Sequence, residues 1–240
     1  MATVQSERAD AGIEVLRLDR PQQRNAMSSE LLAELEELLA RAAADDELRV
    51  LVISTTDTRA LCAGADVAEV LDHAGGVQRM EAFARLYAAI EAFPAPTIAV
   101  CVGNCVGAGA ELVAGCDLRV GGDNLKLAWA GSRLGVPVGP ARLAPLVGLS
   151  RAKELILTGR VVGMEEADAL GLLARTAPQD GAEAEALALA REIAAHPPDG
   201  LRRLKGMFRD FEGSEGRVAR ENEILVRWQA EGAGLPQGRH

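Results

Sequence analysis

The first half of the chain alternates short apolar runs with longer amphipathic stretches. Apolar and polar residues alternate over residues 13–18, which predicts a half-buried strand, and continuous apolar runs at 50–54 and 97–102 predict strands buried on both faces. Ser28 or Ser29 can cap a helix that extends to about residue 44. One stripe of this helix is formed by Leu31, Leu32, Leu35, Leu38 and Leu39.

Two loops rich in glycine and alanine, residues 59–66 and 103–109, follow the two buried strands. The helices and strands expected next cover residues 77–92, 108–115, 118–120 and 126–129. From residue 141 onward the pattern is almost wholly helical and contains no linker. This repetition of strand, small-residue loop and helix, followed by a helical last third, predicts one α/β domain over residues 1–240.

The composition limits the class of protein. The chain has 240 residues, of which 48% are hydrophobic, and a formal net charge of −9. Lys and Arg are scattered rather than clustered, which argues against a nucleic-acid partner. The longest apolar run is far too short to span a bilayer, and the first residues lack the pattern of a secretory signal. We therefore expect a cytoplasmic protein without a membrane partner.

Four cysteines lie in apolar or glycine-rich segments, at Cys62, Cys101, Cys105 and Cys116. Free cysteine in such surroundings behaves as a small buried hydrophobe. None of the histidines lies nearby, so we expect no metal site and a reducing compartment.

The two small-residue loops are suited to hold a developing negative charge. A reaction at the α or β carbon of a thioester passes through an enolate, and a backbone N–H that stabilises its oxygen contributes roughly 2.7–4 kcal/mol. Segments 62–66 and 107–111 each follow a buried strand and precede a helix, where N–H groups favour an anion. Taken singly, each is better explained as an ordinary turn. The second is not a dinucleotide fingerprint, because Leu112 occupies the third glycine position.

Four segments together resemble the enoyl-CoA hydratase/isomerase (crotonase) superfamily. They are LDRPQQRNAMSSEL (18–31), RALCAGADVAEV (59–70), GNCVGAGAELVAGCDLRV (103–120) and AKELILTGRVVGMEEADALGLL (152–173). The resemblance implies a crotonase-like spiral of ββα repeats over about residues 1–195, with a helical C-terminal region at about 196–240. It also implies chemistry on acyl-CoA thioesters through an enolate in an oxyanion hole. Coenzyme A is then part of the substrate, and we expect no separate cofactor.

The same resemblance assigns site residues. Ala63 and Ala108 match the two oxyanion-hole donors, with Ala108 in place of the family's usual glycine. The expected CoA-binding residues are Arg24, Asn25, Ala26, Ala63, Gly64, Ala65, Asp66 and Ala108. Asp66 and Asp117 also have the features of helix caps or loop anchors.

Glu111 matches the first catalytic glutamate of enoyl-CoA hydratases, and a partly buried carboxylate suits proton transfer. It also suits the first turn of a helix. The second glutamate of the family is absent, because Gly131 stands at its position and no acidic residue occurs between Asp123 and Glu154. Ser132 and Trp129 are the polar neighbours, although Trp129 is better explained as a core residue.

Three interpretations follow from the missing carboxylate: a double-bond shift by one base, hydration with a replacement acid or at a reduced rate, and an acyl-CoA binder without catalysis. A hydrolase of the Clp-protease type is disfavoured because the sequence has no G-x-S-x-G segment. The resemblance also implies a homotrimer or hexamer. The apolar residues of the last helices suit such an interface or internal packing: Leu204, Met207, Phe208, Phe211, Ile224, Leu225 and Trp228.

Overall fold

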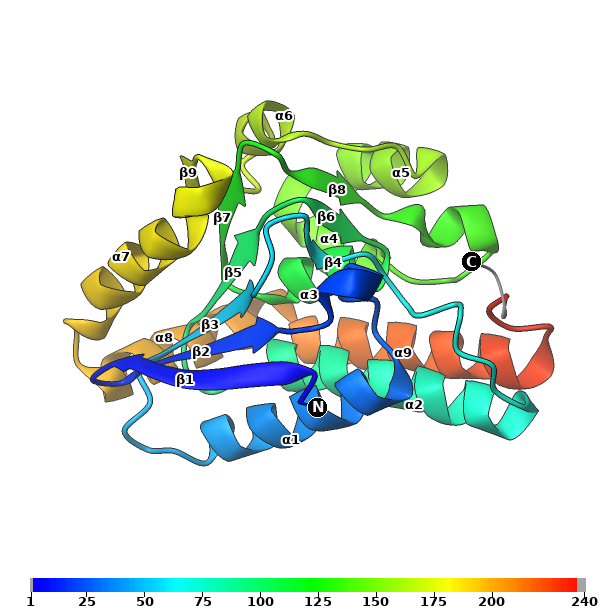
Figure 1. Ribbon diagram of the computed structural model, residues 1–240, viewed down its shortest axis with the longest axis horizontal. Coiled ribbons are helices and arrows are strands. Elements are labelled where there is room, and N and C mark those ends of the chain that lie inside the picture. Colours follow the sequence, from blue (N-terminus) through cyan, green and yellow to red (C-terminus); the bar gives the residue numbers. More distant parts are fainter. Residues whose placement is uncertain (1, 237–240) are drawn as a thin grey trace.

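Two β-sheets and the helices around them form the structure, a computed structural model that describes residues 2–236 (Figure 1). The ends of the expected 1–240 domain lie outside this range. The strands are β1 (Val4–Asp10), β2 (Ile13–Leu18), β3 (Val50–Thr55), β4 (Ala60–Cys62), β5 (Thr97–Cys101), β6 (Asn104–Val106), β7 (Leu118–Gly122), β8 (Lys126–Ala128) and β9 (Arg175–Ala177). The α-helices are α1 (Ser29–Ala43), α2 (His73–Glu91), α3 (Ala108–Gly115), α4 (Pro140–Val147), α5 (Leu149–Thr158), α6 (Met164–Ala169), α7 (Ala182–Ala194), α8 (Pro198–Glu212) and α9 (Ser214–Glu231). Short 3₁₀ turns are η1 (Pro21–Gln23), η2 (Ala130–Leu134) and η3 (Gln179–Gly181).

The chain passes repeatedly from one sheet to the other. The larger sheet has the order β1-β2-β3-β5-β7-β9, in which β1 is antiparallel to β2 and the other neighbours are parallel. The smaller sheet has the order β4-β6-β8 and is parallel throughout. Each pair β3–β4, β5–β6 and β7–β8 is followed by a helix, α2, α3 or α4, so three ββα turns form a spiral. The expected spiral of ββα repeats is therefore present.

The larger sheet is covered on both faces. Val50 and Val52 of β3 pack in a cluster with alanines of α7, which recur every four residues at Ala182, Ala186, Ala190 and Ala194. Leu51 and Ile53 of the same strand belong to the main core, on the opposite face. Burial on both faces explains why β3 and β5 are continuous apolar runs.

The elements expected from the hydropathy pattern differ from the observed ones mainly in the small-residue loops. Strand β2 and helix α1 lie where they were expected, and the Leu31 N–H donates to the hydroxyl of Ser28 at 3.3 Å. Residues 60–62 and 104–106 were expected to be loop but are strands of the smaller sheet. Strand β1 was not expected, because most of its residues are exposed and polar.

The C-terminal helices occupy two environments. Helix α9 lies beside α2 (Figure 1), where the Asn222 side chain donates to the Ala84 carbonyl at 2.8 Å. Leu225 is buried there, whereas exposed fractions on α8 are high, at 69% for Phe208 and 80% for Phe211. Internal packing thus accounts for only part of the apolar content of these helices. Within residues 2–236, every helix is too short or too polar to cross a membrane.

Candidate active site

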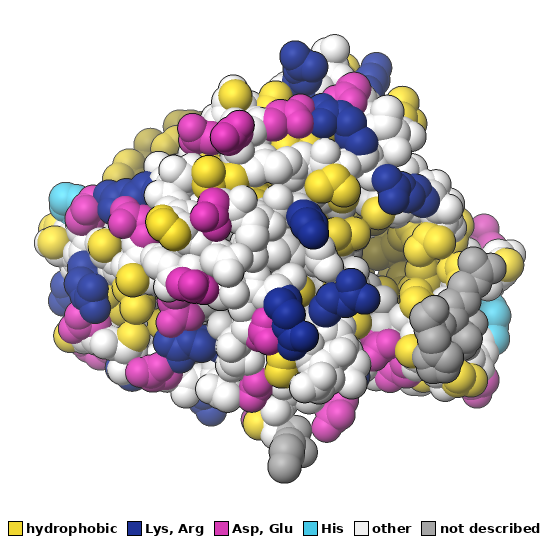
Figure 2. Space-filling view, turned by 45° about the horizontal axis from the view of Figure 1, so that its top comes forward, with side chains coloured by type: hydrophobic (Ala, Val, Ile, Leu, Met, Phe, Trp, Pro, Cys, Tyr) yellow, Lys and Arg dark blue, Asp and Glu magenta, His cyan; other side chains and the backbone are white. Residues whose placement is uncertain are grey.

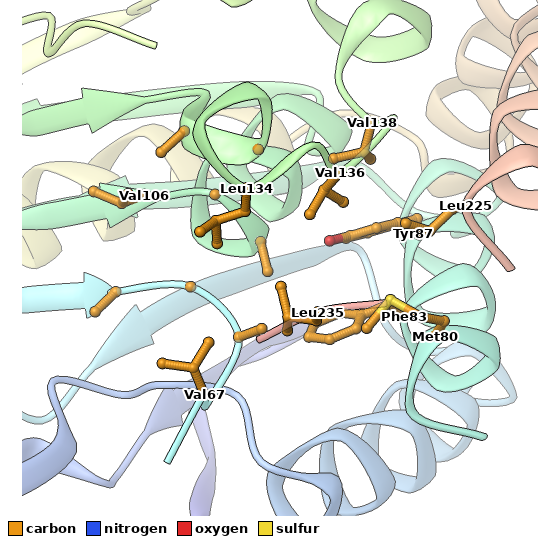
Figure 3. A pocket seen from close by; sticks show the side chains of 17 residues that line it. Val67, Met80, Phe83, Tyr87, Val106, Leu134, Val136, Val138, Leu225 and Leu235 are labelled. Carbon is orange, nitrogen blue, oxygen red and sulfur yellow. The ribbon is translucent and has the colours of Figure 1, made fainter. Parts of the chain in front are cut away.

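A cavity of about 240 Å³ lies where the two small-residue loops meet helix α2 and the segment after η2. Its wall includes Ala65 and Ala108 from the loops, Tyr87 from α2, and Val136 and Val138 after η2 (Figure 3). A hollow lined by hydrophobic side chains is visible on the surface, with Lys or Arg side chains at its rim (Figure 2). The lining is almost wholly apolar, so the cavity suits a small hydrophobic group.

The two loops are in contact, and glycines make this contact possible. Gly64 has a φ of +113° and Gly107 a φ of +55°, values that residues with a side chain rarely adopt. A Cβ on Gly64 would lie 3.2 Å from the Val106 carbonyl oxygen, and one on Gly107 would lie 3.9 Å from the Gly64 Cα. The residues that follow, Ala65 and Ala108, therefore begin from adjacent points of the backbone.

The backbone donors at the cavity are those of Ala65 and Ala108. Neither N–H has a hydrogen-bond partner among residues 2–236. The Ala63 N–H, by contrast, donates to the Arg24 carbonyl at 3.0 Å. The assignment of Ala63 as a donor is therefore wrong in this structure, because its N–H is already used to tie the first loop to residue 24.

The backbone explains why alanine is accepted at position 108. The left-handed conformation falls on Gly107, and Arg24 and Asn25 are the non-glycine residues with positive φ in the described part of the chain. Ala108 is therefore free of the strain that a positive φ would impose. The next residue must be glycine, since a Cβ at Gly109 would lie 2.3 Å from the Cys62 carbonyl oxygen.

Glu111 belongs to a buried cluster of three charged side chains. Its Oε2 accepts a hydrogen bond from Arg142 Nε at 2.7 Å, and Arg142 Nη2 donates to Glu221 Oε1 at 2.5 Å. Glu221 Oε2 also accepts from the Ala141 N–H at 2.8 Å. Arg142 and Glu221 were not predicted from the sequence. The sequence feature that could have indicated them is the arginine in the otherwise apolar helix α4, because a buried arginine requires an acidic partner.

The position of Glu111 gives it an unusual acidity. It lies one helical turn beyond Ala108, is only 1% exposed, and is not among the residues that line the cavity. Burial raises the pKa of Glu111 to about 7, against the opposing effect of the Arg142 guanidinium, and the Glu221 carboxylate adds to the rise. Its Oε1 has no partner within residues 2–236 and lies 3.1 Å from the Cβ position of Gly139. Glu111 is thus a buried carboxylate with a raised pKa that lies next to Gly139 and outside the cavity lining.

No carboxylate replaces the missing second glutamate on the described cavity wall. Gly131 lies in η2 and lines the cavity. Ser132 is exposed and does not line it, and Trp129 is 2% exposed, as expected of a core residue.

The residues expected to bind coenzyme A have different roles in the structure. Asn25 is fully buried, and its side chain donates to Thr55 Oγ1 at 2.8 Å and to the Ala60 carbonyl at 3.0 Å. Asp66 pairs with Arg20 at 3.0 Å and accepts from the Ala68 N–H. The side chains of Asn25 and Asp66 therefore hold the loops together rather than face a ligand.

Arg24 and Ala26 are accessible outside the cavity wall, whereas Ala63, Gly64, Ala65 and Ala108 line it. Arg24 is exposed and has no ion-pair partner within the described chain, so its guanidinium is free to meet a phosphate. Ala26 is half-buried beside it, and its carbonyl accepts from the Arg20 side chain.

The cysteines are buried and free, and burial raises the pKa values of the Cys62 and Cys116 thiols to about 12. Among residues 2–236, no group of three or more His, Cys, Asp or Glu side chains could hold a metal ion.

The fold is that of solved enoyl-CoA hydratases. One from Bacillus anthracis has 26% identity and a TM-score of 0.78, and the likeness covers 99% of this chain and 100% of that one. A probable enoyl-CoA hydratase from Mycobacterium thermoresistibile has 27% identity and a TM-score of 0.84, over 94% of this chain and 93% of that one.

Sequence comparison identifies the family. The enoyl-CoA hydratase/isomerase family model matches residues 8–226. The chain is 34% identical to 2,3-dehydroadipyl-CoA hydratase of Escherichia coli, over 88% of this chain and 85% of that protein. It is 37% identical to the human mitochondrial enoyl-CoA hydratase domain-containing protein 2, over 80% of this chain and 69% of that protein. The chain therefore belongs to the enoyl-CoA hydratase/isomerase family.

Proposed function

We propose that the protein binds an acyl-CoA thioester with its carbonyl oxygen between the N–H groups of Ala65 and Ala108, and catalyses hydratase- or isomerase-type chemistry through the enolate. The observation that carries this proposal is the pair of unpartnered donors on two adjacent loops at an apolar cavity. Donors fixed by the backbone stabilise a developing negative charge without having to reorganise. The exposed guanidinium of Arg24 would meet a phosphate of coenzyme A.

Glu111 is the proposed base. Its carboxylate would take a proton from the carbon next to the thioester carbonyl, and the electrons of that C–H bond would form the enolate. Return of the proton to the far end of the conjugated system would move the double bond. With a pKa of about 7, the carboxylate can both accept and release a proton near neutral pH. The segment that includes Gly139, which packs against Oε1, would have to move for the substrate to reach it.

Between the two reactions, the absence of a second carboxylate favours isomerisation. A double-bond shift needs one base, whereas hydration also needs a group that positions water. Gly131 leaves the wall without such an acid, and loss of an acid/base partner typically lowers a rate by about 10²–10⁴.

A non-catalytic acyl-CoA binder is the second candidate. One observation favours it: Glu111 is enclosed by its ion pair with Arg142 and does not line the cavity. Such a protein would keep the donors and the apolar cavity without proton transfer.

Calorimetry and turnover measurements on the purified protein separate these candidates. Calorimetry should show that a saturated acyl-CoA binds much more tightly than the corresponding free acid. Equal or absent binding of the two would contradict the acyl-CoA assignment. A panel of 2-enoyl- and 3-enoyl-CoA esters should then show faster turnover of the 3-enoyl esters. Tight binding without turnover of any ester would favour the binder.

We also propose that the protein assembles as a homotrimer or hexamer in the cytoplasm, with no cofactor apart from the coenzyme A of its substrate. The exposed apolar face of α8 supports assembly, since large apolar patches mark interaction sites. It consists of Leu204, Met207, Phe208 and Phe211, with exposed fractions of 53%, 42%, 69% and 80%. Light scattering at micromolar concentration should give a multiple of three chains, and a monomer would refute the assembly.

A further inference from the structure

Among the described residues that line the cavity, Tyr87 alone carries a side-chain nitrogen or oxygen atom. It lies on α2 and is 4% exposed. Its oxygen points into the cavity (Figure 3). No protein group within residues 2–236 forms a hydrogen bond with this hydroxyl. A buried tyrosine hydroxyl usually has a partner, so the one for Tyr87 has to come from whatever occupies the cavity.

The ring of Tyr87 is held in place from two sides. The Arg142 guanidinium carbon lies 4.4 Å from the ring centroid, and the Phe83 ring stacks with a centroid distance of 5.9 Å and an interplanar angle of 26°. The hydroxyl therefore keeps its direction. Burial raises the pKa of Tyr87 well above its usual value, so the hydroxyl stays protonated and can donate.

The hydroxyl and the two small-residue loops enter the cavity from different sides. Val67 and Val106, next to the loops, lie on one side, and Phe83 and Tyr87 of α2 lie on the other (Figure 3). In the proposed function the reacting carbons sit beside the loop donors. Tyr87 then faces a more distant part of the acyl chain.

A wholly apolar chain would displace water from this hydroxyl and leave it unpaired. Burying an unpaired polar group weakens binding by roughly 10- to 100-fold. A charged partner is disfavoured as well, because no Lys, Arg or His lines the described cavity wall and an unpaired buried carboxylate is costly.

We propose that Tyr87 is a specificity-determining residue that selects acyl groups carrying a neutral oxygen, as a hydroxyl or keto group, beyond the β-carbon. The inference rests on the proposed function, because it takes the cavity to be the acyl site. It goes further in naming the class of acyl group.

The test is equilibrium binding of matched saturated acyl-CoA esters, which do not react. A plain six-carbon ester is compared with esters of the same length that carry a hydroxyl group at the fourth, fifth or sixth carbon, or a keto group at the fourth or fifth carbon. We expect at least one oxygenated ester to bind about 10-fold more tightly than the plain one. In Tyr87→Phe, which keeps the ring stacked on Arg142, this preference should disappear through tighter binding of the plain ester and weaker binding of the oxygenated one.

Two controls separate recognition from structure. Val67→Ala reshapes the opposite wall of the cavity but leaves the hydroxyl and both contacts of the Tyr87 ring in place, so absolute affinities change while the preference remains. Without ligand, Tyr87→Phe should be as stable as the unmodified protein or slightly more so, because the hydroxyl has no protein partner to lose. A clear fall in the unfolding temperature would show that the hydroxyl has a structural role and would overturn the inference.

Several outcomes would refute this specificity. Equal binding of the plain and all oxygenated esters would refute it while leaving the acyl-CoA site intact, and tightest binding of a terminal carboxylate would refute the neutral oxygen. If Tyr87→Phe lowers turnover of plain and oxygenated substrates alike, the hydroxyl acts on the reacting atoms instead. No binding of any ester would remove the proposed function, and this inference with it.

Discussion

Replacement of Glu111 by glutamine tests the proposed base. Glutamine keeps the size of the side chain and can accept the hydrogen bond from Arg142 Nε, but it cannot take up a proton. Arg142 also keeps its second partner, Glu221, so the fold should survive. We expect kcat to fall by about 10²–10⁴, or roughly 3–5 kcal/mol of activation free energy, while acyl-CoA binding is retained.

The buried position of Glu111 also predicts the pH dependence. The pKa of Glu111 rises from the ordinary value of 4.5 to about 7, which corresponds to roughly 3 kcal/mol of added cost for the ionised carboxylate. Because a base acts in its ionised form, kcat/KM should rise with pH through about 7 and level off above it. Steady-state rates from pH 5 to 9 with the best enoyl-CoA ester measure this midpoint.

Glu221→Gln is the matched control, since Glu221 shares the Arg142 guanidinium but lies on α9, away from the proposed chemistry. The Glu221 carboxylate raises the pKa of Glu111, so removing its charge should move the midpoint to lower pH and leave most of the plateau rate. Full activity in Glu111→Gln would refute the assignment of the base. A midpoint that stays fixed in Glu221→Gln would refute the electrostatic account.

Three further substitutions, two of them with a matched control, probe other parts of the structure. Gly109→Ala should lower the unfolding temperature, because its Cβ would overlap the Cys62 carbonyl and such overpacking costs roughly 1–3 kcal/mol of folding free energy. Its control, Gly216→Ala, adds a Cβ in open space on α9 and should raise the unfolding temperature slightly. An unchanged unfolding temperature for Gly109→Ala would contradict the close packing. Gly131→Glu, whose Cβ would lie 3.2 Å from the Val136 carbonyl oxygen, should hydrate a 2-enoyl-CoA faster than Gly131→Gln does. Equal hydration rates of the two variants would show that a carboxylate at position 131 cannot act on the substrate. Phe211→Asp should convert the oligomer to smaller species in light scattering, and an unchanged mass would exclude α8 from the interface.

Long elements with a clear apolar pattern were predictable from the sequence. The residues of strand β3 are buried without interruption, and the buried residues of helix α1 recur with helical spacing. The three-residue strands β4 and β6 were harder, because they lie in loops whose small residues carry no alternation. Strand β1 has mostly exposed polar side chains, so only its pairing with β2 defines it.

The candidate site was predictable as a pair of loops but not atom by atom. Sequence similarity located segment 62–66, but Ala63 and Ala65 differ only in where their N–H groups point, and the Arg24 carbonyl decides between them. The pairing of Glu111 with Arg142 joins residues that are 31 positions apart and depends on how α4 packs against α3. Nothing in the sequence distinguishes Tyr87 from other residues of its helix, because only the structure shows that its hydroxyl faces an otherwise apolar cavity.

The most direct test of the central claim is the carbonyl stretching frequency of a bound thioester. A saturated acyl-CoA with a ¹³C-labelled carbonyl, bound to the protein, is measured by infrared difference spectroscopy against the same ester in water. Two hydrogen bonds from the N–H groups of Ala65 and Ala108 would polarise the carbonyl, so its frequency should fall below the value in water. A frequency equal to or above that value would place the carbonyl in the cavity without these donors and would contradict the proposed oxyanion hole.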